Sequence, residues 1–207
     1  MSTIILPNTD LFCPGDFLIQ IRGNILVNVS PMNGSTQTVE MPGDRIVFTL
    51  MYGPHHSSDI AALRAFWLRF RGQAHVLRLW NLAQPIPLGT LRGSPVLESA
   101  AVEGANSVVI SGTGGSTLNV GDWIGITLST SDLQTVEVVE SSGTGTITVG
   151  INPPLRRSAA DGATVVWQRP WVDCLLTSPP TIPHGKGSAN QMGISDGFTI
   201  EAAEFVP

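Results

Sequence analysis

Apolar and polar residues alternate along most of the chain, which is the pattern of β-strands with one buried face. The clearest case is Arg45–Tyr52, where large apolar residues fall at every second position. Phe17–Val29 alternates in the same way, with a turn expected at Gly23-Asn24, and His75–Trp80 predicts a further strand. The amino-terminal part of the chain is therefore predicted to be mainly β.

Short alternating runs separated by Gly- and Ser-rich turns follow in the middle of the chain, and they predict five strands in about sixty residues. These strands are expected at Ser107–Ser111, Asp122–Leu128, Gln134–Glu140, Thr146–Ile151 and Thr164–Gln168. Two more are expected towards the carboxyl end, at Val172–Leu176 and Gly197–Glu204. Many short strands at this spacing favour a small barrel of OB-like character or a compact sandwich.

One segment breaks the β pattern and predicts a helix over about residues 58–71. Its apolar residues recur at helical spacing and form a wide stripe. They are Ile60, Leu63, Phe66, Trp67 and Phe70. A stripe of this width indicates a helix packed on a sheet.

These elements predict a mainly β fold with two modules. Residues 1–98 and 169–207 would form a β-sandwich-like module with the single flanking helix. Residues 99–168 would form an inserted OB-like β-barrel domain. The chain has 207 residues, which is enough for each module to bury a core.

Composition indicates surface that is hidden in an assembly. Only 13% of the residues are charged, and Lys186 is the only lysine. Lysine commonly guards exposed sheet edges, whereas arginine is the cation that interfaces tolerate. A compositional habit of the host genome that favours arginine codons is the alternative explanation.

The charges are unevenly distributed along the chain. Five arginines and no acid lie between Ile60 and Leu97, whereas six acids and no base lie between Glu98 and Glu140. The arginines are Arg64, Arg69, Arg71, Arg78 and Arg92, and we expect them at or near a subunit contact. Two ordinary solvated faces would explain the same pattern. The formal net charge of −5 argues against general binding of nucleic-acid phosphates.

Residue patterns that could carry catalysis or metal binding have structural explanations. His55-His56 has no further ligand at metal spacing, HGKGS (184–188) lacks the glycine and hydroxyl positions of a phosphate loop, and GTGGS (112–116) fits a hairpin turn. Asp122 and Glu137 could meet across strands, where acid pairs are usually solvated. We therefore expect no enzyme, no catalytic residue, no cofactor and no metal.

Three tryptophans could form an aromatic platform for a glycan, namely Trp123, Trp167 and Trp171. Core packing is the commoner role of tryptophan in strands. Cys13 and Cys174 match no metal or redox motif; buried thiols are the default, and one disulfide is possible. The first ten residues lack the features of a signal peptide, and no apolar run is long enough to span a bilayer.

Three stretches resemble tail proteins of long-tailed bacteriophages, in particular the small distal-tail or tail-tip proteins. They are PMNGSTQTVEMPGDRIVFTL, AFWLRFRGQAHVLRLWNLAQPIPLGTLRG and NPPLRRSAADGATVVWQRP. The resemblance covers most of the chain from Pro31 to Pro170, and it rests on overall texture rather than on a catalytic signature.

This resemblance implies a ring-forming β module with a helix on its flank and an inserted OB-like domain outside the ring. It implies a hexameric ring of identical copies, which DNA crosses only transiently through the channel. The implied partners are the tail tube protein, the tail hub and fibre or receptor-binding proteins, without membrane insertion. The implied location is the virion tail, assembled in the cytoplasm of the host bacterium.

Two other functions remain open at this point. The chain could be a carbohydrate- or receptor-binding module of a phage tail, using the inserted domain. It could also be an enzyme such as a cell-wall hydrolase, although no converging histidines and carboxylates support that function.

Overall fold

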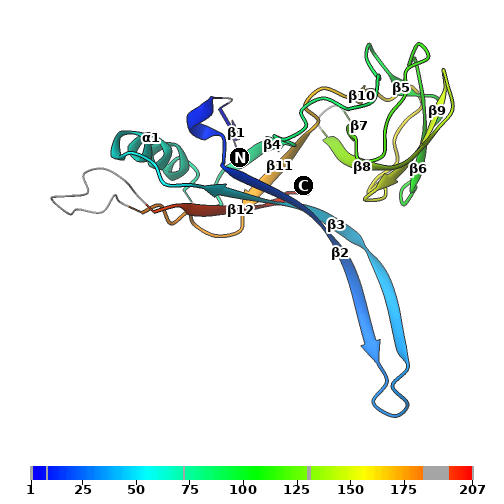
Figure 1. Ribbon diagram of the computed structural model, residues 1–207. Helices are drawn as coiled ribbons and strands as arrows, with labels where there is room; N and C mark the ends of the chain where they lie inside the picture. Colours follow the sequence, from blue (N-terminus) through cyan, green and yellow to red (C-terminus); the bar gives the residue numbers. More distant parts are fainter. Residues whose placement is uncertain (1, 8, 72, 130–131, 184–195, 207) are drawn as a thin grey trace. The chain divides into compact units, whose positions relative to one another are not determined.

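The computed structural model describes residues 2–7, 9–71, 73–129, 132–183 and 196–206 (Figure 1). The described chain divides into two compact units. The first unit contains residues 1–20, 46–83 and 172–207, and the second contains residues 21–45 and 84–171. The predicted inserted segment, 99–168, lies inside the second unit, which begins earlier and ends later.

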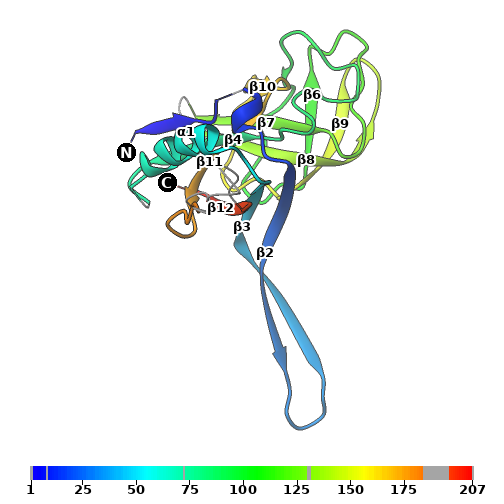
Figure 2. The same ribbon diagram turned by 60° about the vertical axis from the view of Figure 1, so that its left-hand side comes forward.

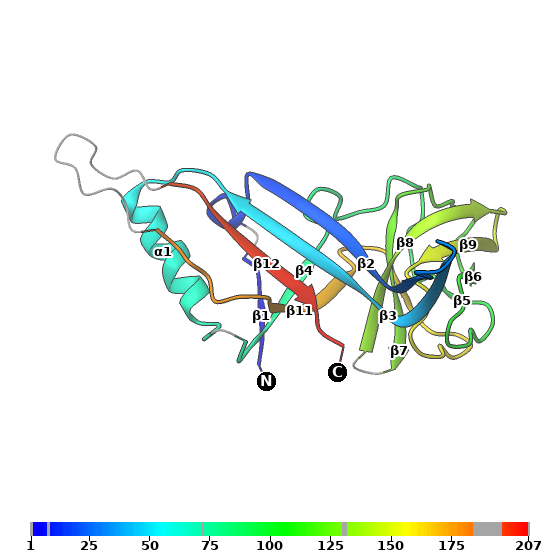
Figure 3. The ribbon, with the colours of Figure 1, turned by 90° about the horizontal axis from the view of Figure 1, so that it is seen from below.

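A six-stranded mixed sheet forms the framework of the first unit, and Figure 3 shows its strands side by side. The strand order is β1 (Thr3–Ile5), β4 (Val76–Trp80), β11 (Trp171–Leu176), β12 (Phe198–Glu204), β3 (Thr36–Tyr52) and β2 (Asp16–Val29). β1 runs parallel to β4, whereas β12 is antiparallel to both β11 and β3. A 3-10 turn, η1 (Asp10–Phe12), connects β1 to β2.

The alternating pattern of β3 is explained by the helix that packs beside this sheet. Tyr52 and Leu50 lie opposite Phe198 and Ile200 of β12, and all four side chains are buried. Helix α1 (Ser57–Leu68) contributes aromatic rings to the same core. The Phe66 and Trp67 rings lie 5.2 Å apart, and Trp67 also contacts Tyr52.

The predicted helix is present but ends earlier than expected. Arg69 is its C-cap, and Arg71 adopts a left-handed conformation with φ of 46°. A non-glycine residue in that region cannot continue a right-handed helix, so the helix stops before 71. Ile60, Leu63, Phe66, Trp67 and Phe70 are all buried, as the apolar stripe predicted.

A nearly closed, six-stranded antiparallel barrel forms most of the second unit. Its strand order is β10 (Val165–Val166), β7 (Trp123–Ser129), β8 (Asp132–Ser142), β9 (Ile147–Asn152), β6 (Ser107–Ser111) and β5 (Val96–Leu97). The first and last strands meet at a seam, where Leu97 N–H donates to Ala163 O and Val165 N–H donates to Pro95 O. These bonds bring the two ends of the sheet together.

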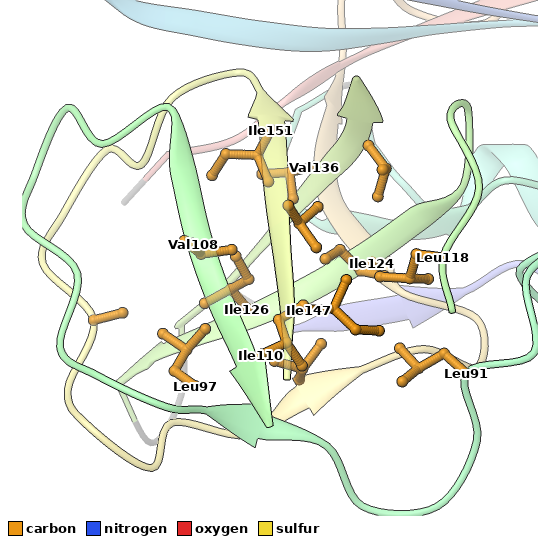
Figure 4. Close-up of a cluster of buried hydrophobic side chains, with 14 of the residues drawn as sticks. Leu91, Leu97, Val108, Ile110, Leu118, Ile124, Ile126, Val136, Ile147 and Ile151 are labelled. Carbon is orange, nitrogen blue, oxygen red and sulfur yellow. The ribbon is translucent and has the colours of Figure 1, made fainter. Parts of the chain in front are cut away.

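Aliphatic side chains fill the interior of this barrel (Figure 4). Ile110, Ile124, Ile126, Val136 and Ile147 have no exposed surface. Each points inward from its strand, where every second residue faces the interior. This is why the period-two pattern located these strands in the sequence. All five strands expected between residues 107 and 168 are present, although β10 is only two residues long.

The barrel is inserted between two neighbouring strands of the first sheet, because β4 precedes it and β11 follows it. Arg78 of β4 and Asp173 of β11 form a bidentate ion pair, with Nε–Oδ1 and Nη2–Oδ2 distances of 2.7 and 2.8 Å. This hydrogen bonding raises the pKa of the Arg78 guanidinium. The prediction of a mainly β chain with one helix and a small inserted barrel is confirmed.

The turn expected at Gly23-Asn24 is a wrong prediction, because β2 continues without interruption from Asp16 to Val29. Asn24 N–H donates to Asp44 Oδ1 on the facing strand at 2.9 Å. This long-range contact holds Asn24 beside β3, so a Gly-Asn pair that often forms turns is kept extended. β1 and β5 were not expected, and they have only three and two residues.

Candidate functional site

The strongest functional candidate is a long two-stranded ribbon, defined here as residues 21–45, in which β2 and β3 run together to a turn (Figure 2). Ser30 N–H donates to Ser35 O at 2.8 Å, and Gly34 N–H donates to Ser30 O at 3.0 Å. Gly34 has φ of 69°, a conformation that favours glycine. The turn is therefore well formed, although much of β2 and β3 on either side of it is exposed.

Large apolar side chains are exposed along this ribbon. Ile25, Leu26, Val27 and Val29 each keep 55–56% of their surface exposed, and Met32 in the turn keeps 95%. Successive residues of a strand point to opposite faces, so Leu26 lies on one face and Ile25 and Val27 on the other. Both faces of the ribbon therefore present apolar surface.

The ribbon also lacks the usual protection of an exposed β-structure. No charged residue occurs between Arg22 and Glu40, and the chain's only lysine is elsewhere. Within the described residues, β12 pairs with β3 over Val47–Tyr52 and not along the ribbon. Charged side chains normally blunt such edges. A ribbon without them is suited to pairing or packing with another chain.

The five arginines proposed for a subunit contact do not share one role. Arg64 is half-buried in α1, while Arg69 and Arg71 are exposed just after it. Arg78 is engaged with Asp173, and Arg92 stacks on the Trp167 ring at 5.1 Å from its centre. Internal contacts thus already use Arg78 and Arg92, and the expected subunit contact through these residues stays a prediction.

The three candidate tryptophans differ in their accessibility. Trp123 is 6% exposed, which leaves little of its ring for a glycan. Trp167 is half-buried, and its Nε1–H donates to Gly93 O at 2.9 Å. Trp171 is half-buried, and its carbonyl oxygen accepts a 2.6 Å bond from Thr135 Oγ1. Glycan binding through these residues stays a prediction.

The candidate acid pair has structural roles in the barrel. The Asp122 carboxylate is fully buried and accepts four hydrogen bonds, from Gln84 Nε2 and from the backbone N–H groups of Leu88, Gly89 and Asn119. Glu137 lies opposite Trp123 in the β7–β8 register, and partial burial raises the pKa of its carboxyl group. Asp122 is thus a hub for backbone amides.

The other motifs show no assembled chemical site. His55 Nδ1 lies 2.6 Å from Gly53 O, and the part of the chain described here holds no group of three or more His, Cys, Asp or Glu suited to a metal ion. GTGGS lies between strands β6 and β7, as a turn segment would, and HGKGS lies outside the described residues. Cys13 and Cys174 are free thiols; Cys174 is buried, but Cys13 is exposed, so a buried thiol was a wrong expectation there.

No helix among the described residues has the length and apolar character needed to cross a lipid bilayer. The ribbon was not predicted as a functional site, although the sequence carries a signal for it. That signal is the long uncharged stretch between Arg22 and Glu40 combined with strand-forming aliphatic residues. No known family model matches this chain, and no curated protein matches it either.

Proposed function

We propose that the chain is a structural subunit that assembles with copies of itself, and that its assembly is the ring of a bacteriophage tail tip. The observation that carries self-assembly is the exposed apolar ribbon. The resemblance of the three quoted stretches to distal-tail proteins supports the tail assignment. In this role the ring links the tail tube to the host-recognition apparatus, and DNA passes through its channel.

A protein partner suits the ribbon better than a lipid surface does. Proteins that lie in membrane interfaces place Trp and Tyr at the boundary and basic residues beside it. The chain contains no aromatic residue between Phe17 and Phe48 and no basic residue between Arg22 and Arg45. Its exposed aliphatic residues are of the kind found in the cores of obligate subunit interfaces.

Identical copies are the simplest partner, because most soluble oligomers are homo-oligomers with closed symmetry. Two-stranded ribbons are marginally stable alone in water, so contacts with a neighbouring copy would stabilise this one. The low charge content of the chain agrees with surface that assembly removes from water.

Light scattering and negative-stain imaging of the purified protein test this proposal. The wild-type protein is expected to form a closed ring of several copies with a central channel. Leu26→Glu combined with Val27→Glu puts a charge on each face of the ribbon, and it should yield folded monomers. Val102→Glu, at a 70% exposed position of the barrel, is the matched control and should assemble.

A wild-type protein that stays monomeric at every concentration would overturn the proposal. Open filaments or dimers would retain self-assembly but overturn the ring. Glycan binding by a monomeric wild-type protein would favour the carbohydrate-binding alternative instead.

A further inference from the structure

We propose that the ribbon of one copy binds a pair of uncharged loops on the barrel of the next copy. The loop pair is defined as residues 84–91 and 113–121. This inference rests on the proposed function, because it names the surface that accepts the ribbon.

The loop pair exposes large apolar side chains at fixed positions. Leu88 keeps 74% of its surface exposed and Val120 keeps 69%, while Ile86 keeps 41%. Neither loop contains a charged residue. Single exposed aliphatic residues are ordinary, but three of them on two adjoining loops make a surface suited to a partner.

The buried carboxylate of Asp122 holds both loops. Leu88 N–H donates to its Oδ1 at 2.6 Å, and Asn119 N–H donates to its Oδ2 at 2.7 Å. Burying a carboxylate is costly unless it is fully hydrogen-bonded. The barrel thus places a fully bonded charge directly beneath the two segments that carry Leu88 and Val120.

Further contacts join the two loops to each other. Leu91 N–H donates to Thr117 O at 3.1 Å, and Thr117 N–H donates to Thr90 Oγ1 at 3.0 Å. Gly89 packs so closely that an added Cβ would collide with the Thr117 carbonyl. Loops fixed in this way lose little conformational entropy when a partner binds, so their exposed apolar residues are pre-organised for contact.

The neutrality of the loop pair matches the ribbon better than other exposed apolar positions of the barrel do. Val102 is followed by Glu103, and Val139 is followed by Glu140. The uncharged part of the ribbon, residues 23–39, laid over either position would remove water from a carboxylate without offering it a cation. A ribbon bound to the loop pair covers two loops that contain no charged residue.

The loop pair is a different surface from the ribbon, which is the kind of contact that a ring requires. A ribbon that binds a different surface on its neighbour makes a head-to-tail contact, and repeated contacts of that kind close into a ring when the rotation allows. Two ribbons that bind each other would make a symmetric contact and stop at a dimer. The proposed ring therefore needs an acceptor away from the ribbon.

Disruption of the acceptor is the first test. Leu88→Glu combined with Val120→Glu should weaken association by at least about 100-fold, because each interface would bury unpaired carboxylates. Val102→Glu should leave association unchanged. Circular dichroism and denaturation midpoints would establish that all variants fold.

If the loop variant assembles like the wild type while the ribbon variant does not, the acceptor is wrong and self-assembly through the ribbon stands. If both variants assemble normally, both proposals fail.

Cross-linking tests the contact directly in a Cys13→Ser background, which leaves only the buried Cys174. Copies carrying Val27→Cys are mixed with copies carrying Leu88→Cys and then oxidised. A disulfide between the two kinds of copy supports the proposal. Disulfides formed only between two Val27→Cys copies would overturn it in favour of a ribbon-to-ribbon dimer, and the absence of any cross-link in an assembled sample would also overturn it.

Discussion

The barrel and the ribbon both place aliphatic residues on extended strands, yet the surroundings of these residues differ. In the barrel, Ile124 and Ile126 have no exposed surface, because a nearly closed sheet has an interior (Figure 4). In the ribbon, Ile25 and Val27 remain more than half exposed. A sheet of two strands has no interior of its own, so a strand pattern alone does not determine what covers its apolar side chains.

The two regions therefore differ in what covers their apolar side chains. The interior of the barrel is covered within the chain, and its buried Asp122 carboxylate accepts four hydrogen bonds. The ribbon leaves its large apolar side chains exposed. Mutations in the barrel interior should therefore change the free energy of unfolding, whereas those in the ribbon, like those in the loop pair, should change association.

The largest effect is expected from Asp122→Ala in the barrel. This change removes a carboxylate that accepts bonds from three backbone amides, and it should lower the free energy of unfolding by about 4 kcal/mol. Urea denaturation measures the effect, with Asp161→Ala at an exposed position as the control. A loss below about 1 kcal/mol would contradict the role of Asp122 as a hub.

A paired substitution tests the comparison itself. Ile126→Ala in the barrel should cost about 3 kcal/mol of stability, because it leaves a cavity in a closed core. Ile25→Ala in the ribbon should cost less than about 0.5 kcal/mol in dissociated protein, because the side chain is already half in water. Equal losses in the two variants, measured by denaturation under dissociating conditions, would remove the distinction between the regions.

A smaller effect is expected at the barrel seam. Trp167→Phe keeps most of the ring but removes the Nε1–H bond to Gly93 O, which should cost about 1 kcal/mol. Hydrogen exchange should become faster at the amides that join the seam, Leu97 and Val165. Arg157→Ala, which removes an ion pair with Asp132 at the barrel surface, is the control and should leave these amides unchanged. Unchanged exchange in Trp167→Phe would show that the ring packing alone closes the seam.

The smallest effect concerns pH. Burial raises the pKa of Glu137 in the folded barrel above its ordinary value, so the folded state holds this proton more tightly than the unfolded state does. Stability from this group is present below the unfolded pKa and is lost as pH rises through the folded pKa. Glu137→Gln should therefore raise the thermal midpoint slightly at neutral pH and flatten its decline as pH rises through the folded pKa of this carboxyl group. A variant with an unchanged pH profile would contradict this assignment.

Strands with long alternating patterns could be predicted from the sequence, and shorter ones could not. Arg45–Tyr52 and the barrel strands carried enough alternation to be located. β1 could not be found, because its three residues become a strand only by pairing with Val76–Arg78, far along the chain. The extended form of Gly23-Asn24 depends on Asp44 in the same non-local way. The Asp122 hub was equally hidden, since its donors come from two separate loops.

The ribbon shows a second kind of miss, because its strand was predicted from the sequence but its exposed apolar surface was not. Alternation identified Phe17–Val29 as strand, but exposure is a property of the folded sheet. The uncharged stretch from Gly23 to Val39 was visible in the sequence and could have indicated the contact surface. The contact was instead predicted on the five arginines, and the fold uses Arg78 and Arg92 in internal contacts.

The insertion of the barrel between neighbouring strands makes it an exchangeable cassette. The chain leaves the first sheet after β4 and returns to it at β11, and the Arg78–Asp173 ion pair joins these two strands two residues from each crossing. A foreign domain whose ends lie close together could be grafted at this junction without altering the order of the sheet.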